Sequence, residues 1–252
     1  LRGRRLLAAF DFDGTLARIA LRPEQVVTPP AVRAALDRLR GCCATAVISG
    51  RARADVQERL GVAVDYVVGN HGIDGLPGAE REAAECVAVS RAWLAQLRKG
   101  DALRTVDPGI LLEDKRVSLS VHYRQARDGP RAMAQLPAVF AGLQPEPRIV
   151  TGKMVYNLLP PAAVDKGTAM LRLLELSCAD AGLYVGDDDT DEDVFRLHQP
   201  DLLTIRVGRD EASRARYYLR APSELPRLID ALIAALATAS GGGARRSGAA
   251  AH

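Results

Sequence analysis

The apolar residues at the start of the chain form short runs separated by stretches with helical spacing. Such runs are typical of buried strands in a parallel sheet, and they occupy residues 6–10, 44–48 and 66–68. Between them, the pattern predicts helices over 29–40 and 51–60, since helical apolar positions recur every three or four residues. This β-α-β-α-β order predicts a parallel sheet with helices on both faces.

The pattern changes after residue 72. One helix is expected over 79–99 and another over 130–143, where Pro137 should kink or break it because proline has no backbone N–H to donate. Strands are expected at 109–112, 117–123 and 154–159. Strands joined by short connections favour an antiparallel sheet, so we predict an inserted α+β domain over residues 73–161.

The α/β pattern then returns. Its expected helices and strands occupy residues 166–176, 182–185, 191–197, 202–207 and 223–237. The predicted fold class is therefore α/β: a Rossmannoid core with a parallel sheet, formed by residues 1–72 and 162–239, plus an inserted α+β cap domain. Residues 240–252 have no periodicity and are expected to form a flexible tail.

Composition narrows the class of protein. Hydrophobic residues make up 48% of the chain, which predicts a packed core. The 34 basic and 31 acidic residues nearly balance, which argues against a nucleic-acid partner. The run at 6–10 is too short for a signal peptide, and no apolar stretch is long enough for a membrane span. We expect a soluble cytoplasmic protein without a membrane partner, a monomer or a weak oligomer, whose four cysteines are reduced thiols.

Two carboxylates, Asp11 and Asp13, follow the first predicted strand in the run DFDGTL. Side chains two residues apart on an extended segment point to the same side, and ligands bind at this edge of a parallel sheet. One carboxylate can attack phosphorus while the other carries a proton. Gly14 permits a sharp turn, although the same residues also occur in ordinary surface turns.

A second acidic cluster, GDDDTDED, spans residues 186–193 after another predicted strand. So many carboxylates repel one another without a cation, and oxygen ligands without nearby histidine or cysteine favour Mg²⁺. A calcium loop would need an alternating acidic spacing that is absent here. A solvated helix start, where acidic residues are favoured, is the remaining alternative.

Two shorter motifs can bind an anion. Ser49, Gly50 and Arg51 follow the second strand where a helix is expected to begin, and free N–H groups at a helix start attract anions. Asp165 and Lys166 open the helix after the inserted domain, so Lys166 can place a positive charge on a phosphate. Taken singly, Ser49 could be an ordinary helix cap and Lys166 a solvated surface residue.

The order of these motifs resembles the haloacid dehalogenase (HAD) superfamily of phosphatases, and the position of the insertion resembles its C2 cap subclass. The chain is more closely similar to trehalose-6-phosphate phosphatases over about residues 7–236. That similarity is carried by the run GDDDTDED and by residues 69–72, 113–115, 122–124 and 152–153.

The resemblance implies roles for these residues and hydrolysis of trehalose 6-phosphate to trehalose and phosphate. Asp11 would be the nucleophile that forms an aspartyl phosphate, and Asp13 the acid and base. Ser49 and Lys166 would hold the phosphoryl oxygens. Mg²⁺ would bind Asp11, the backbone carbonyl of Asp13, Asp187, Asp188 and Asp191, the last two completing or supporting its shell. The implied substrate-binding residues are Gly50, Arg51, His71, Glu113, Lys115, Arg124 and Asn157.

One of these positions departs from the family pattern. Asn157 stands where trehalose-6-phosphate phosphatases usually carry a glutamate that binds the sugar distal to the phosphate. Asparagine both donates and accepts but lacks the charge of glutamate. The substrate could therefore be a related disaccharide phosphate or an aminocyclitol pseudodisaccharide phosphate. Another C2-capped sugar phosphatase and a catalytically silent sensor are further alternatives.

Overall fold

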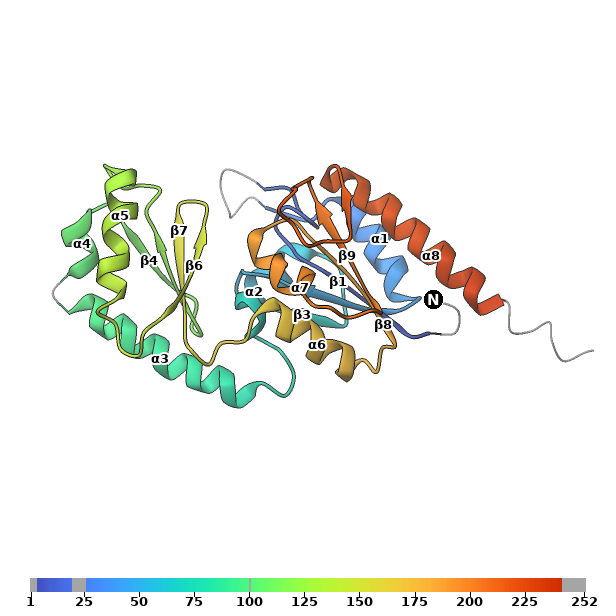
Figure 1. Ribbon diagram of the computed structural model, residues 1–252, viewed down its shortest axis with the longest axis horizontal. Coiled ribbons are helices and arrows are strands. Elements are labelled where there is room, and N and C mark those ends of the chain that lie inside the picture. Colours follow the sequence, from blue (N-terminus) through green and yellow to red (C-terminus); the bar gives the residue numbers. More distant parts are fainter. Residues whose placement is uncertain (1–3, 20–25, 100, 242–252) are drawn as a thin grey trace, which may run out of the picture. The chain divides into compact units, whose positions relative to one another are not determined.

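The computed structural model describes residues 4–19, 26–99 and 101–241. The chain divides into two compact units: Leu1–Gly72 together with Asp165–His252, and Ile73–Val164. Figure 1 shows both units. The sequence had placed the second boundary after residue 161. No helix in the described parts of the chain is long and apolar enough to cross a lipid bilayer.

The first unit is built on a six-stranded parallel sheet with the order β10-β9-β8-β1-β2-β3. Its strands are β1 (Leu6–Phe10), β2 (Ala44–Ile48), β3 (Tyr66–Val68), β8 (Ala181–Gly186), β9 (Leu202–Val207) and β10 (Tyr217–Leu219). The α/β class and the parallel sheet are as predicted. β10 was not predicted, because its short run contains two exposed tyrosines and shows no apolar alternation.

Helices cover both faces of this sheet. They are α1 (Pro30–Arg40), α2 (Arg53–Leu60), α6 (Lys166–Leu176), α7 (Glu192–Phe195) and α8 (Leu225–Gly241), with 3₁₀ turns η2 (Asn70–Gly72), η3 (Asp189–Asp191) and η4 (Pro222–Glu224). α1 and α8 lie side by side (Figure 1) and share a core with Ala8 and Phe10 of β1. Leu7 and Ala9 alternate to the other face, where α6 packs against β1 and β2.

Two predicted segments at the C-terminal end differ from the structure. α8 begins at Leu225, two residues after its predicted start, because Pro222–Glu224 forms a separate 3₁₀ turn. The expected flexible tail began at residue 240, but α8 continues to Gly241. The rest of that tail, from residue 242, lies outside the described residues.

The order of the strands creates one special position in the sheet. The chain runs from β1 through β2 to β3 in one direction and later from β8 through β9 to β10 in the other. β1 therefore pairs with β2 on one side and with β8 on the other. In open α/β sheets, ligands bind where the strand order reverses, beyond the carboxyl ends of the strands. Here that place lies beyond β1 and β8.

The second unit has a four-stranded antiparallel sheet with the order β4-β5-β7-β6. Its elements are α3 (Glu80–Arg98), α4 (Ala102–Val106), β4 (Leu111–Asp114), β5 (Leu119–His122), α5 (Gly129–Phe140), β6 (Arg148–Gly152) and β7 (Val155–Leu159). β4 begins two residues later than predicted, because the backbone N–H of Gly109 turns back to Asp107 Oδ1, 2.7 Å away. The edge strand β6 was missed because most of its residues are exposed.

Pro137 does not break α5. The helix runs through it, and the Ala141 N–H donates to the Pro137 carbonyl. A proline at this position leaves the carbonyl four residues earlier, that of Met133, without its helical donor. The hydroxyl of Tyr156, on β7, donates to that carbonyl instead, at 3.0 Å. The sheet thus satisfies the polar group that the proline leaves free.

The hydrogen bond from the Tyr156 hydroxyl to the Met133 carbonyl gives a prediction about stability. Tyr156→Phe removes the hydroxyl but keeps the buried ring, so the Met133 carbonyl loses its donor in a partly buried hydrogen bond. We expect a loss of about 1–2 kcal/mol in the free energy of unfolding, measured by chemical denaturation. Tyr123→Phe is the control: its ring lies 5.5 Å from that of Tyr156, and its hydroxyl makes no hydrogen bond to the described residues. Equal losses in both variants would contradict the assigned role of the Tyr156 hydroxyl.

Candidate active site

The loop after β1 presents Asp11 and Asp13 on the side opposite Phe12. The Asp11 N–H donates to the Val185 carbonyl, at 2.8 Å, which ties this loop to the end of β8. Phe12 is buried in the hydrophobic core. Gly14 has a φ of +81°, a conformation that favours glycine. The loop is therefore anchored by an apolar residue between two acidic ones.

A buried lysine links the loop after β1 to the loop after β8. The ammonium of Lys166 donates to Asp11 Oδ1 and to Asp191 Oδ1, both at 2.7 Å. The three side chains are only 2%, 6% and 0% exposed, respectively. Lys166 is the first residue of α6, which Asp165 caps by accepting the Thr168 N–H at 2.7 Å. The start of α6 thus carries a fixed positive charge to the carboxyl ends of β1 and β8.

The charges of this cluster depend on one another. Burial alone would lower the pKa of Lys166, but the charges of Asp11 and Asp191 raise it above its ordinary value. Burial raises the pKa of the Asp11 carboxyl, and Lys166 acts in the opposite direction. The lysine therefore remains an ammonium, and it is the positive partner that a buried Asp11 requires.

Asp191 organises the loop that follows β8. Its Oδ1 accepts from Lys166 and from the Tyr184 hydroxyl, at 2.7 Å each. Its Oδ2 accepts the N–H groups of Asp187, at 2.8 Å, and Asp188, at 2.9 Å. A carboxylate has about four acceptor positions, so these four donors use its capacity. This geometry suits a supporting role better than a direct ligand role.

Asp187 faces the loop after β1. Its Oδ1 accepts from the Thr15 hydroxyl at 3.3 Å, and a Cβ added to Gly14 would lie 1.9 Å from its Oδ2. Only glycine at position 14 therefore leaves room for this carboxylate. Burial, followed by the charges of Asp191 and Asp188, raises the pKa of Asp187 to about 7.

Asp11 and Asp187 can supply oxygens to a cation, with Asp191 supporting them. Oxygens of Asp11, Asp187 and Asp191 all lie within 4.8 Å of one another. Hard oxygen donors are suited to a divalent cation. Burial first, and then the neighbouring carboxylates, raise the pKa of Asp187, and a bound cation would offset that negative charge. Asp188 is exposed, and its Oδ1 accepts the Asp189 N–H, so its carboxylate lies outside this cluster.

The segment after β2 differs from the prediction. α2 begins at Arg53, not Arg51, so Ser49 and Gly50 do not adjoin a helix start. The reason is a second loop: the Asn70 N–H donates to the Arg51 carbonyl at 2.7 Å, and the His71 N–H to the Ser49 carbonyl at 2.9 Å. Ser49 is buried, and its Oγ accepts the Arg51 N–H at 3.2 Å. A Cβ on Gly50 would lie 2.6 Å from the His71 ring.

Arg51, expected to contact the substrate, pairs with Asp13. Its Nε and Nη2 donate to the two oxygens of that carboxylate, at 2.6 and 2.8 Å. Its Nη1 donates to Asp55 Oδ2 at 2.7 Å, and Asp55 Oδ1 accepts from Arg59 Nε at 2.6 Å. Asp55 and Arg59 were not among the predicted site residues, although their four-residue spacing on a helix is typical of an ion pair.

The remaining expected residues lie in the second unit. The register places Glu113, Ser120 and Asn157 in one row across the sheet, on the face opposite its apolar core. His122 Nε2 and Glu113 Oε2 are 2.8 Å apart on the same face. Lys115 lies in the turn between β4 and β5, and Arg124 follows the other end of β5. The face opposite the apolar core is therefore polar, with a charged residue beyond each end of β5.

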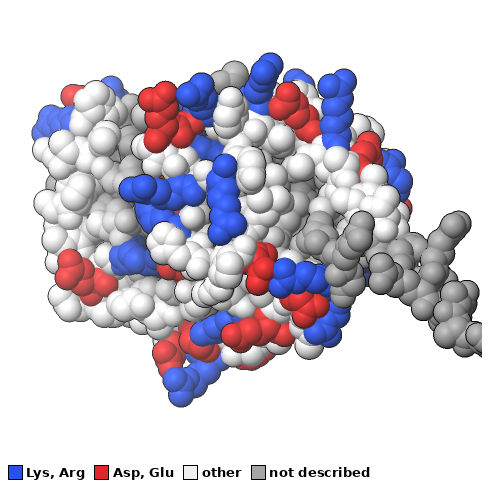
Figure 2. Space-filling model, turned by 45° about the vertical axis from the view of Figure 1, so that its right-hand side comes forward, with Lys and Arg blue, Asp and Glu red and all other residues white. Residues whose placement is uncertain are grey.

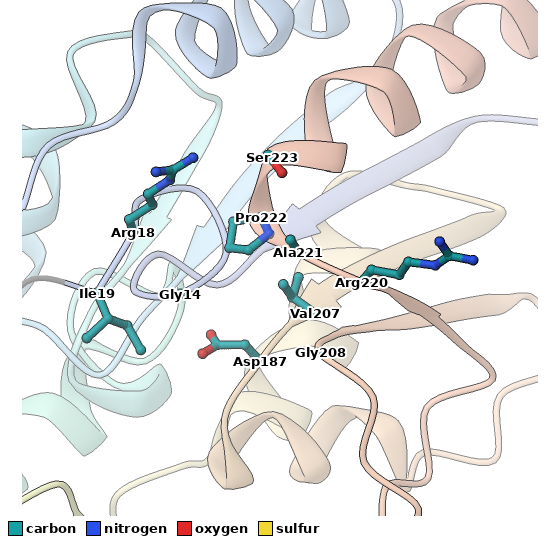
Figure 3. A pocket seen from close by; sticks show the side chains of 10 residues that line it. All are labelled: Gly14, Arg18, Ile19, Asp187, Val207, Gly208, Arg220, Ala221, Pro222 and Ser223. Carbon is teal, nitrogen blue, oxygen red and sulfur yellow. The ribbon is translucent and has the colours of Figure 1, made fainter.

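A cavity of about 400 Å³ adjoins the acidic cluster within the first unit. Gly14 and Asp187 form the side shared with the candidate site (Figure 3), and Arg18 and Arg220 lie on opposite sides of the cavity. On the face drawn in Figure 2, basic and acidic side chains are mixed, in keeping with the balanced charge.

Comparison of whole structures places this fold in a known class. The chain superposes on a phosphatase of the haloalkanoate (HAD) enzyme superfamily from Bacteroides thetaiotaomicron with a TM-score of 0.56, covering 95% of this chain and 97% of the other, at 12% identity. It superposes on the C-terminal domain of Candida albicans trehalose-6-phosphate phosphatase with a TM-score of 0.68, covering 92% of each chain at 22% identity. These similarities establish the HAD fold.

Sequence comparison identifies the family. The family model for trehalose-phosphatase matches residues 9–223, and the chain therefore belongs to the trehalose-phosphatase family. It is 33% identical over 244 residues to the trehalose-phosphate phosphatase of Mycobacterium marinum, covering 91% of this chain and 62% of the relative. It is 34% identical over 247 residues to that of Mycobacterium avium, covering 92% and 63%. The chain thus spans just over three fifths of these curated relatives.

The acidic cluster predicts stabilisation by a divalent cation. Saturating Mg²⁺ or Mn²⁺, at about 100 times the dissociation constant, should stabilise the fold by about 2.7 kcal/mol and raise the thermal midpoint Tm by roughly 5–10 °C. Chelation with EDTA should reverse the shift. Asp187→Asn should remove most of it, because it takes one carboxylate from the cluster.

Asp188→Asn is the matched control for this experiment. It changes the adjacent acidic residue, whose side chain lies outside the cluster, so the Tm shift should be retained. Equal losses from the two variants would instead place Asp188 among the ligands.

Proposed function

We propose that this chain is a Mg²⁺-dependent phosphatase that hydrolyses trehalose 6-phosphate to trehalose and phosphate through an aspartyl-phosphate intermediate. Family membership supports the reaction class. The observation that carries the proposal is the buried contact of Lys166 with Asp11 Oδ1. It fixes one oxygen of a carboxylate at the point where the strand order reverses and leaves Oδ2 for attack on phosphorus.

In the first step, a lone pair of Asp11 Oδ2 forms a bond to phosphorus as the bond from phosphorus to the sugar oxygen breaks. Asp13 gives its proton to that departing oxygen. Lys166 and Ser49 hold phosphoryl oxygens, and the positive charge of Lys166 offsets the repulsion between the carboxylate and the phosphate. When bound, Mg²⁺ would be held by Asp11, Asp187 and the carbonyl of Asp13 and would neutralise further negative charge.

In the second step, water attacks the phosphorus of the aspartyl phosphate and gives a proton to Asp13. The bond between phosphorus and the Asp11 oxygen breaks, which restores the carboxylate and releases inorganic phosphate. Asp13 therefore ends each cycle with the proton that it needs for the next. The bidentate contact with Arg51 orients the ionised Asp13 carboxylate, which is the form that accepts the proton from water.

The polar face of the second unit is the proposed site for the sugar rings. Glu113 and Asn157 offer polar groups in one row of the sheet, and Lys115 and Arg124 offer donors beyond its ends. His71 and Gly50, in the first unit, lie beside Ser49 and would adjoin the phosphate end of the substrate. Sugar hydroxyls both donate and accept, so a mixed set of this kind suits them.

Phosphate release from a small panel tests the reaction and its substrate. We expect trehalose 6-phosphate to be preferred over sucrose 6-phosphate, glucose 6-phosphate and an aminocyclitol pseudodisaccharide phosphate. Asp11→Asn should lower kcat by at least about a thousandfold, because it removes the nucleophile, while circular dichroism shows a retained fold. Substantial turnover by Asp11→Asn would contradict the mechanism.

The second candidate substrate is the aminocyclitol pseudodisaccharide phosphate, and the environment of Asn157 bears on it. Asn157 Oδ1 accepts from the Ser120 hydroxyl at 2.6 Å, and its Nδ2 donates to the Val150 carbonyl at 3.4 Å. A carbonyl can only accept, so it sets the orientation of the amide. A glutamate here would bring a second acceptor towards Val150 and would add a charge. Asn157 therefore changes how the distal ring is recognised.

Asn157→Glu tests this substrate effect. We expect the ratio of kcat/KM values for trehalose 6-phosphate and the pseudodisaccharide phosphate to change by about tenfold or more, because a charged acceptor replaces a neutral amide. Asn157→Gln is the control, since it adds the same length without charge. An unchanged ratio in Asn157→Glu would mean that Asn157 is a neutral family variation.

A further inference from the structure

Four side chains of alternating charge form a row that begins at Asp13 and continues into α2: Asp13, Arg51, Asp55 and Arg59. Asp55 accepts from two arginines at once: Arg51 Nη1 at 2.7 Å on Oδ2, and Arg59 Nε at 2.6 Å on Oδ1. Arg59 also donates to the Val26 carbonyl, at 3.4 Å. Asp55 and Arg59 are one helical turn apart, so α2 itself sets their separation.

The guanidinium of Arg51 is held from three directions. Two nitrogens contact Asp13, the third contacts Asp55, and its carbon lies 5.7 Å from the centre of the Phe12 ring. The Arg51 side chain is 15% exposed, so water competes little for these donors. A planar guanidinium that is fixed on both edges also fixes the plane of the carboxylate it pairs with.

Asp55 is well suited to anchor the Arg51 guanidinium. Burial would raise the pKa of its carboxyl, but the hydrogen bonds from Arg51 and Arg59 hold it below its ordinary value. With Asp55 absent, Arg51 Nη1 would lose its acceptor, and the guanidinium would keep only Asp13 and the Phe12 ring among the contacts described above. The orientation of Asp13 would then depend on one flexible side chain.

We propose that Asp55 is a positioning residue, which acts through Arg51 to hold the Asp13 carboxyl group where its protonated form can give a proton to the departing sugar oxygen. This inference rests on the proposed function. It predicts an effect confined to reactions whose leaving group requires that proton. A sugar alkoxide is a poor leaving group, whereas p-nitrophenolate is stable enough to depart without protonation.

The test compares Asp55→Asn with the unaltered chain on trehalose 6-phosphate and on p-nitrophenyl phosphate. The quantity is kcat/KM, which covers the steps up to departure of the leaving group. We expect a loss of about tenfold or more with the sugar phosphate, mainly in kcat, and a change of less than about twofold with p-nitrophenyl phosphate. Asp55→Glu, which restores the charge, should recover much of the loss.

Glu58→Gln is the matched control. Glu58 lies on the same helix, is exposed, and makes no ion pair with the described residues. It should leave both kcat/KM values unchanged. If Asp55→Asn does not fold, Arg59→Lys serves instead, because it loosens the same anchor and should give a smaller loss with the same dependence on leaving group.

Two results would overturn the inference. Equal losses with both substrates would show that Asp55 only maintains structure, and no loss with either would show that Arg51 needs no anchor. A different failure belongs to the proposed function: if the unaltered chain releases phosphate from neither compound in the presence of Mg²⁺, the phosphatase assignment falls, and this inference falls with it.

Discussion

The contact of the buried Lys166 ammonium with Asp11 and Asp191 is the interaction on which the rest of the site depends. Taking an ion out of water costs several kcal/mol unless a partner of opposite charge compensates. Here the partners come from the loop after β1 and the loop after β8, and the lysine comes from the start of α6. Three elements must therefore meet at one point, and each charged group is costly to bury without the others.

The backbone must also leave room for these buried side chains. A Cβ on Gly186 would lie 2.3 Å from the Asp191 carboxyl carbon, so the end of β8 accepts only glycine if Asp191 is to reach Lys166. Gly14 leaves room for Asp187 in the same way. The hydrogen bonds of Asp191 to two successive N–H groups then curve the loop that carries Asp187. The geometry of the acidic cluster is thus set before any cation or substrate binds.

Sequence patterns predicted the parts of the fold that depend on local periodicity. β1, β2, β3, α1 and α6 were found within a residue, because each is a clear apolar run or an amphipathic stretch. The sequence could not show that Arg51 pairs with Asp13, since this contact depends on a loop held by Asn70 and His71. Nor could it show that Pro137 is tolerated, since the compensating hydroxyl comes from a strand nineteen positions later.

The Lys166–Asp11 contact joins residues 155 positions apart, and most of that distance is the second unit. During synthesis, one edge of β1 stays unpaired until β8 has emerged, because β8 is its partner on that side. The cluster of Asp11, Lys166 and Asp191 can therefore form only after Asp191 has been synthesised. The entropy of closing such a long excursion grows only logarithmically, by about 0.6 kcal/mol for each doubling of length. The inserted unit can therefore vary in length at little thermodynamic cost to the contact between Lys166 and Asp11.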